Sequence, residues 1–206
     1  ISLPTLGTIT TNFEYIVSGS RPDQELFYGF TSFLFPLSIY RYDFANDKSE
    51  ALFAPPIAFD TTGYETRQVF VRSKDGTQIP LFLTHKKDLR LDGKNPTLLY
   101  GYGGFSVSLM PGFATSRLAW LEMGGVYAQA VLRGGGEYGE EWHQAGMLHN
   151  KQNVFDDFIA CAEWLIAEKI TSTPKLAING SSNGGLLVSA CLTQRPDLFG
   201  ACLPDV

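Results

Sequence analysis

A serine framed by glycines is the first feature of the sequence that could do chemistry. Residues 180–185 read Gly-Ser-Ser-Asn-Gly-Gly, which fits the pattern G-x-S-x-G with Ser182 at its centre. In this pattern the serine stands on a sharp turn between a strand and a helix, where its hydroxyl is exposed. Glycine is needed two residues before and two residues after the serine, because the two backbone arms of such a turn nearly touch. The pattern predicts that Ser182, and not Ser181, is a nucleophile.

The sequence around Ser182 favours this interpretation over two others. The run at 175–179 predicts a strand before the serine, and residues 184–194 predict a helix after it. The N-terminus of that helix would direct backbone N–H groups at a developing negative charge. A phosphate-binding loop is disfavoured, because Leu186 and Leu187 stand where lysine and serine or threonine are required. A glycine-rich loop with incidental serines is the structural alternative.

A second glycine cluster follows another strand of the buried type. Residues 97–100 read TLLY, and residues 101–105 read GYGGF. In enzymes that use such a serine turn, the loop in this position supplies the second donor of the oxyanion hole. The glycines would let the backbone approach a substrate closely, Tyr102 could offer its phenolic O–H, and Phe105 could form an apolar wall. A glycine-rich turn with two core aromatic residues is the alternative.

A third cluster imitates a dinucleotide-binding motif. Residues 134–139 fit G-x-G-x-x-G after a predicted strand at 126–132, and Asp156 or Asp157 lies about twenty residues further on. However, glutamates at 137, 140 and 141 would place carboxylates where the pyrophosphate binds. We therefore favour a structural loop beside the active site.

The histidines limit what these residues could do alone. A serine nucleophile needs a base, and in hydrolases that use this turn an acid and then a histidine follow the serine along the chain. The three histidines, His85, His143 and His149, all precede Ser182. His143 or His149 could in principle act as the base, but surface or supporting roles are favoured. We expect the base to come from residues outside this chain, and the histidine and glutamate spacing contains no zinc motif.

Two regions with different residue patterns must position these residues. The first 56 residues contain short runs typical of strands, which we expect to form one antiparallel meander with the layout of a β-propeller blade. After two prolines at 55–56, a hairpin turned at Asp75-Gly76 leads into alternating strands and helices. This is the order of the α/β-hydrolase fold, so the predicted fold class is α/β, a partial α/β-hydrolase preceded by about one propeller blade. The predicted strands are 7–10, 14–18, 25–33, 38–44, 68–72, 78–84, 97–100, 126–132 and 175–179, and the predicted helices are 116–123, one that Asn153 caps, and 184–194.

The composition is that of a globular protein. The 206 residues are 44% hydrophobic and 18% charged, and the formal net charge of −5 favours neither nucleic acid nor an anionic membrane surface as a partner. No apolar run is long enough for a membrane span, and no secretory signal opens the sequence. Cys161, Cys191 and Cys202 are odd in number and lie in apolar surroundings, which predicts core thiols of a reducing compartment. We therefore expect a cytoplasmic protein without a metal site.

Five segments together resemble the prolyl oligopeptidase family of serine peptidases. They are TLLYGYGGF at 97–105, GGVYAQAVLRGGGEYG at 124–139, NKQNVFDD at 150–157, INGSSNGGLL at 178–187 and QRPDLFG at 194–200. The resemblance implies that residues 1–56 are the C-terminal end of a β-propeller domain. It implies that residues 57–206 are the N-terminal part of a truncated α/β-hydrolase catalytic domain. Ser181 is a departure, because the family usually has glycine before the nucleophile.

The resemblance also implies an activity and a role for each site residue. The activity would be hydrolysis of short peptides on the carboxyl side of proline through an acyl-enzyme on Ser182, without a metal or another cofactor. The backbone N–H of Asn183 and the hydroxyl of Tyr102 would form the oxyanion hole, Phe105 would line the proline pocket, and Asn183 would also contact substrate. A related peptide macrocyclase and a non-catalytic binding protein on a hydrolase scaffold are the alternatives. Alone, this chain is expected to be inactive and to need the remaining segments of the same enzyme for a complete fold.

Overall fold

The computed structural model describes residues 3–10 and 24–205. Contacts within the chain divide it into two compact units. The first unit consists of Ile1–Thr66 and Met110–Ala119, and the second consists of Arg67–Leu109 and Trp120–Val206.

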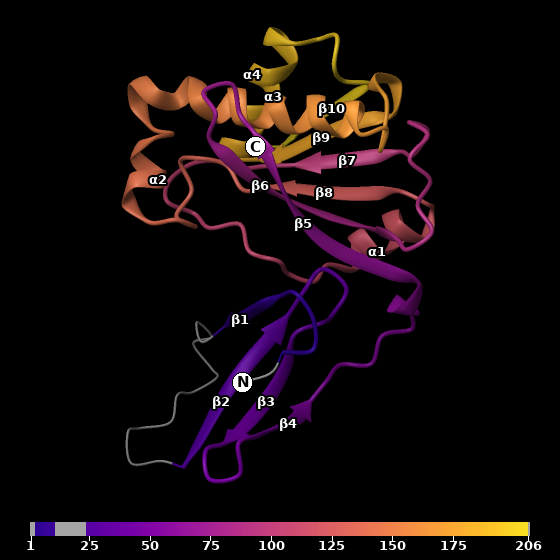
Figure 1. Ribbon diagram of the computed structural model, residues 1–206, viewed down its shortest axis with the longest axis vertical. Helices are drawn as coiled ribbons and strands as arrows, with labels where there is room; N and C mark the ends of the chain where they lie inside the picture. Colours follow the sequence, from indigo (N-terminus) through magenta and orange to yellow (C-terminus); the bar gives the residue numbers. More distant parts are fainter. Residues whose placement is uncertain (1–2, 11–23, 206) are drawn as a thin grey trace. The chain divides into compact units, whose positions relative to one another are not determined.

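The first unit contains a four-stranded antiparallel sheet whose strand order follows the chain (Figure 1). Tyr28 stacks on Tyr40 with ring centroids 5.3 Å apart, and Phe30 is fully buried, so aromatic rings hold the two middle strands together. The last strand is exposed along its length and pairs only with its predecessor within the described sheet. Such an open edge needs a neighbour to cover it. The strands are β1 (Thr8–Thr10), β2 (Glu25–Thr31), β3 (Ser38–Asp43) and β4 (Lys48–Phe53), followed by a 3₁₀ turn at Thr61–Gly63.

Two strand predictions need comment. The predicted strand at 14–18 lies outside the described residues. The sequence Lys-Ser-Glu-Ala-Leu-Phe of β4 was not predicted as a strand, because an exposed strand lacks the apolar alternation that reveals a half-buried one. Its pairing with β3 forms it instead, with Asp43 opposite Lys48 at the turn.

The second unit is built on a six-stranded mixed sheet with the order β10-β9-β7-β8-β6-β5. β6 runs antiparallel to β8, whereas β7, β8, β9 and β10 pair in parallel. The strands are β5 (Tyr64–Arg72), β6 (Gln78–Lys86), β7 (Thr97–Tyr100), β8 (Val126–Ala130), β9 (Leu176–Ser181) and β10 (Ala201–Asp205). Helix α1 (Thr115–Glu122) is divided between the two units at Ala119. The other helices are α2 (Glu140–Gln144), α3 (Lys151–Ala167) and α4 (Asn183–Gln194), with 3₁₀ turns at Leu148–Asn150 and Thr173–Lys175. None of the helices in the described ranges is long and apolar enough to cross a membrane.

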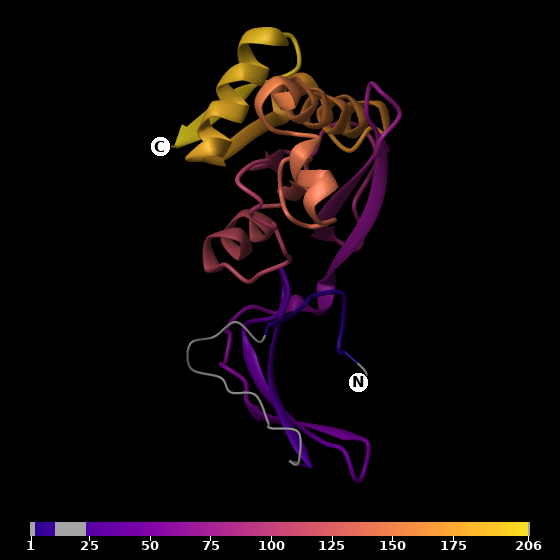
Figure 2. The ribbon, with the colours of Figure 1, turned by 90° about the vertical axis from the view of Figure 1, so that its left-hand side faces the viewer.

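The core of the second unit lies between this sheet and two helices. All five residues of β8 are buried, as expected for a central strand covered on both faces. Val154, Phe158 and Leu165 bury one face of α3 at helical spacing. Helices α3 and α4 lie against each other on one side of the sheet (Figures 1 and 2). This packing brings the start of α3 close to the turn that leads from β9 into α4.

The start of α3 differs from the prediction. The helix begins at Lys151 with Asn150 as its N-cap residue, so the prediction that Asn153 caps it is wrong. A 3₁₀ turn at Leu148–Asn150 already curves the chain into the helix, and the side chain of Asn153 donates to the carbonyl of Ala145 at 2.9 Å. Helix α2 and strand β10 were not predicted. β10 contains Pro204, which a strand tolerates at the edge of a sheet, where its missing N–H is not needed.

Candidate active site

Ser182 lies on the turn between β9 and α4 in a strained backbone conformation. Its φ is 54° and its ψ is −117°, which residues other than glycine rarely adopt. The N–H of Ser182 donates to the carbonyl of Asp205 at 2.9 Å, and the carbonyl of Ser182 accepts from the N–H of Gly185 at 2.9 Å. These bonds hold the turn from both sides, and Ser182 itself is exposed. The turn therefore presents the serine hydroxyl to solvent.

The glycines around Ser182 are required by close backbone contacts. A Cβ on Gly180 would lie 2.3 Å from the carbonyl oxygen of Gly184, and a Cβ on Gly184 would lie 2.7 Å from that of Gly101. Neither oxygen belongs to a side chain that could move away. Ser181 is the last residue of β9 and pairs with Asp205 of β10, so the serine that replaces the family's usual glycine is accommodated in the sheet.

The structure brings Asn183 and Tyr102 to the same turn. Asn183 is the first residue of α4, so its backbone N–H has no acceptor within the helix. Its side-chain Nδ2 donates to the carbonyl of Tyr102, in the loop that follows β7. A Cβ on Gly184 would lie 3.7 Å from both Cα and Cδ2 of Tyr102, so the tyrosine packs directly over the turn. Tyr102 thus contacts the turn of Ser182 through Asn183 and Gly184, although 80 residues of sequence separate the tyrosine from the serine.

Phe105 lies in the same loop but points away from the packed residues. Its side chain is 76% exposed, so the described residues do not enclose it in a pocket. The loop reaches this geometry through left-handed backbone conformations at Gly103, Phe105 and Ser106, with φ values of 61°, 53° and 56°. Glycine is required at 103, because a Cβ there would lie 2.3 Å from Cγ1 of Val154. The loop therefore exposes one large apolar ring beside the serine turn.

The third glycine cluster supports this loop. Glu137 accepts from the N–H of Leu109 at 2.7 Å, and burial raises the pKa of its carboxyl group. His143 has its Nδ1 2.8 Å from the carbonyl oxygen of Gly134, and the N–H of Ser106 lies 3.2 Å from the same nitrogen. These contacts of His143 therefore support the loop that carries Phe105, and neither of them is with Ser182.

The other two histidines lie apart from this arrangement. His85 is buried in β6, with Nδ1 2.7 Å from the carbonyl oxygen of Lys86, and His149 is exposed. Within the described part of the chain, no group of three or more His, Cys, Asp or Glu side chains is arranged to hold a metal ion.

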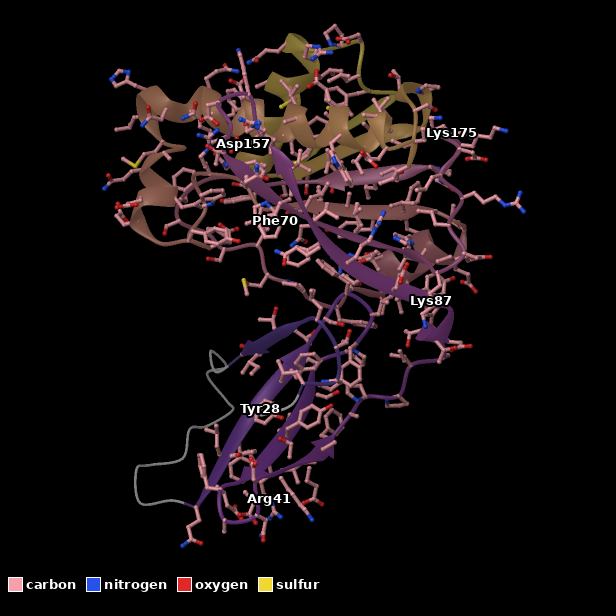
Figure 3. All side chains as sticks on the ribbon, in the orientation of Figure 1. Tyr28, Arg41, Phe70, Lys87, Asp157 and Lys175 are labelled. Atoms are coloured by element: carbon pink, nitrogen blue, oxygen red, sulfur yellow. The ribbon has the colours of Figure 1, made fainter. Side chains whose placement is uncertain are left out.

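Sequence reasoning missed the roles of two charged residues that support the site. Asp157 is fully buried and accepts from Arg133 and from Ser73, so it is an internal ion-pair partner and not a ribose ligand (Figure 3). Lys151 donates to the carbonyl of Gly103 at 2.8 Å and to Oδ1 of Asn183 at 3.1 Å. Asp157 stands out only as a charged residue beside apolar ones, and Lys151 lies among polar residues, so neither position identifies a partner.

The second unit has the strand order of an α/β-hydrolase, and it carries a serine on a strained turn between β9 and the helix that follows. These two features together define the α/β-hydrolase class. Residues 111–206 match the prolyl oligopeptidase family. This match confirms the resemblance to the family that was inferred from the sequence.

Individual relatives agree with this assignment. A prolyl endopeptidase of Elizabethkingia miricola is 47% identical over 188 residues, which cover 91% of this chain and 27% of that protein. A prolyl oligopeptidase of Omphalotus olearius is 47% identical over 192 residues, covering 90% of this chain and 26% of the relative. The chain thus spans about 27% of the length of the curated relatives that it matches.

Solved structures give the same result for the fold. A chain from a study of two prolyl endopeptidases superposes with a TM-score of 0.90 at 50% identity, covering 98% of this chain and 29% of that one. Prolyl oligopeptidase B from Galerina marginata, bound to a 25-residue macrocyclization substrate, superposes with a TM-score of 0.88 at 37% identity, covering 97% of this chain and 28% of that one. These likenesses confirm the predicted fold class, a partial α/β-hydrolase preceded by part of a β-propeller.

Proposed function

We propose that this chain is part of a serine endopeptidase that cleaves short peptides on the carboxyl side of proline. The observation that carries the proposal is the strained turn at Ser182, which exposes a serine beside the loop of Tyr102. The names of its relatives, which are prolyl endopeptidases and prolyl oligopeptidases, support the same activity. A non-catalytic binding protein is disfavoured, because it would have no use for a strained serine turn.

Each site residue has a role in the proposed reaction. The hydroxyl oxygen of Ser182 attacks the carbonyl carbon of the substrate proline and gives its proton to a base. The carbonyl oxygen becomes an oxyanion, which accepts hydrogen bonds from the backbone N–H of Asn183 and the hydroxyl of Tyr102. The carbon–nitrogen bond then breaks, and the leaving amine takes the proton from the base. Water hydrolyses the acyl-enzyme and releases a peptide that ends in proline.

Phe105 and Asn183 hold the substrate in this proposal. The exposed ring of Phe105 packs against the substrate proline, and Asn183 contacts the peptide beside the serine. Short peptides are the proposed partners, and neither nucleic acid nor a membrane is part of the proposal. No metal or other cofactor has a role in the reaction as proposed, since the base, the nucleophile and the oxyanion donors are all protein groups.

The base is proposed to lie in segments of the enzyme beyond this chain. No histidine follows Ser182 in the sequence, whereas the hydrolase order places an acid and a histidine after the serine. We call these 206 residues together with the segments that supply that acid and histidine the intact enzyme. In it, residues 1–56 form the C-terminal end of a β-propeller domain and residues 57–206 the N-terminal part of the catalytic domain.

A cytoplasmic location is proposed on the state of the cysteines. Cys161, Cys191 and Cys202 are all free thiols, and the first two are buried. Burial raises the pKa of Cys191 to about 12, so its thiol stays protonated and unreactive. Fractionation of cells that express the intact enzyme tests this location.

The experiment that tests the function combines labelling and cleavage. The intact enzyme is treated with a fluorophosphonate and is separately assayed with Gly-Pro and Gly-Ala chromogenic substrates. We expect one adduct, on Ser182, and cleavage that strongly favours the proline substrate, with both lost in Ser182→Ala. An adduct on Ser181, or equal cleavage of the two substrates, would refute the assignment.

Macrocyclisation is the second candidate, since the Galerina marginata structure contains a macrocyclization substrate. The acyl-enzyme would then be attacked by the amine of the same peptide and not by water. Mass spectrometry of the products separates the two outcomes, because a cyclic product lacks the mass of one water.

A further inference from the structure

Lys151 joins three segments that meet at the serine turn. It is the first residue of α3, and its ammonium group donates to the carbonyl of Gly103 at 2.8 Å and to Oδ1 of Asn183 at 3.1 Å. These acceptors lie 48 residues before it and 32 residues after it in the sequence. One amine therefore connects the start of α3, the loop after β7 and the first turn of α4.

The lysine also fixes the orientation of the Asn183 side chain. A lysine ammonium can only donate hydrogen bonds, so the oxygen of the Asn183 amide must face it. The amide nitrogen then faces the opposite way and donates to the carbonyl of Tyr102. With the amide reversed, two donors would meet at Lys151 and two acceptors at Tyr102.

The loop after β7 packs tightly on this amide. A Cβ on Gly104 would lie 2.6 Å from Nδ2 of Asn183, so the backbone of the loop touches the side chain that Lys151 orients. Gly101 is equally confined, since a Cβ there would lie 2.8 Å from the ring of Phe158 in α3. A shift of Asn183 would therefore be passed on to the loop that carries Tyr102.

The ammonium group of Lys151 is held at this position although its burial costs solvation free energy. Lys151 is half-buried, and burial lowers the pKa of its amine. Its hydrogen-bond acceptors among the described residues are neutral oxygens and no carboxylate. A surface lysine would be better solvated, so the arrangement is costly for stability alone.

We propose that Lys151 is a positioning residue for the oxyanion hole: by holding Asn183 and Gly103, it keeps Tyr102 in place over the turn of Ser182. This inference rests on the proposed function. Lys151 does not touch the reacting atoms in this role. It acts through the two donors that do, so its loss should affect the transition state more than substrate binding.

The test uses the intact enzyme with Lys151→Met, which keeps the length of the side chain and removes the donors. Lys175→Met is the matched control, because Lys175 is an exposed lysine of the same unit (Figure 3). We expect Lys151→Met to lower kcat and the rate of fluorophosphonate labelling about 10- to 100-fold, with KM changed less than about threefold. Lys175→Met should match the wild type.

A double-mutant cycle separates positioning from a merely structural role. In a Tyr102→Phe background, where one oxyanion donor is already lost, Lys151→Met should reduce kcat by about threefold or less. An equal loss in both backgrounds, or no loss in either, would overturn the proposal. If the methionine variant does not fold, Lys151→Ala, which also removes the donors, takes its place, and wild-type kinetics in it would equally overturn the proposal.

The labelling arm distinguishes failure of this inference from failure of the proposed function. If the wild type reacts with the fluorophosphonate at Ser182 but does not favour proline substrates, the proposed specificity is wrong, and the labelling rates still decide the role of Lys151. If the wild type is not labelled at Ser182, both proposals fail.

Discussion

Arg133 and Asp157 form a buried ion pair with two hydrogen bonds between their side chains. Nε of Arg133 lies 2.9 Å from Oδ2 of Asp157, and Nη2 lies 2.6 Å from Oδ1. The Asp157 carboxylate also accepts from the hydroxyl of Ser73 at 2.6 Å and has no exposed surface. The pair thus ties the loop after β8 to α3 and to the β5–β6 hairpin, next to the segments that build the serine turn.

Removing the charge of Asp157 should destabilise the second unit strongly. Asp157→Asn removes the fully buried carboxylate partner of Arg133 and leaves the guanidinium paired only with the half-exposed carboxylate of Asp75. The loss of a buried ion-pair partner costs about 3–5 kcal/mol of the free energy of unfolding. Denaturant unfolding of the intact enzyme, followed by a probe in the second unit, measures this loss. Asp156→Asn is the matched control, since that neighbour meets Lys74 only at 3.9 Å, and it should lose less than about 1 kcal/mol. Similar losses in the two variants would contradict the prediction.

Asp75 should make a contribution to stability that depends on pH. The N–H of Thr77, and then the guanidinium of Arg133, lower its pKa to about 2. Because the folded-state pKa is below the unfolded value of about 4, the contribution is full above pH 4 and is lost as the pH falls toward 2. Asp75→Asn keeps an acceptor for Thr77 but removes the charge. Its midpoint of thermal unfolding should be below that of the wild type at pH 7 and converge on it below pH 4; a difference independent of pH would count against this assignment.

Tyr102→Phe should lower catalysis with little effect on binding. The substitution removes one proposed oxyanion donor and almost no volume, and the loss of such a donor costs about 10²–10³ in kcat. Steady-state kinetics on a Gly-Pro substrate give kcat and KM separately, and KM should change little. Tyr138→Phe is the control, because Tyr138 is 57% exposed and should tolerate the change. If kcat of Tyr102→Phe equals that of the wild type, the tyrosine has only a structural role.

Phe105→Ala should weaken the preference for proline. Loss of an apolar wall reduces discrimination between substrates by about 1–3 kcal/mol, or roughly 10- to 200-fold in the ratio of kcat/KM values. The measurement compares Gly-Pro and Gly-Ala substrates for each variant. Val107→Ala in the same loop should keep the wild-type ratio. An unchanged ratio in Phe105→Ala would mean that its ring does not contact the substrate proline.

The 206 residues alone should show no peptidase turnover. Without a base for the hydroxyl of Ser182, kcat falls by about 10⁴–10⁶. Purified residues 1–206 are assayed alone and after addition of the remaining segments, which should restore turnover. Turnover by residues 1–206 that Ser182→Ala abolishes would show that His143 or His149 acts as the base.

Several elements could be read directly from the sequence. β7, β9 and α4 were predicted within a residue or two, because apolar runs bounded by glycine report local structure. Strand β4 was missed since its side chains are exposed, and the start of α3 was misplaced because the preceding 3₁₀ turn has no clear signature. Both elements depend on how the chain pairs or turns, which residue types alone do not encode.

The sequence by itself determined the turn at Ser182, because the need for glycine at 180 arises from the backbone of Gly184, only four residues along the chain. Only the tertiary structure decided that Tyr102 packs over this turn, that Lys151 holds Asn183, and that Asp157 pairs with Arg133. These partners are separated by 24 to 81 residues, and the order of the strands brings them together. Periodicity in the sequence reveals helices and strands, but it does not identify the partner of a single polar residue. The fold therefore had to be known before these contacts could be assigned.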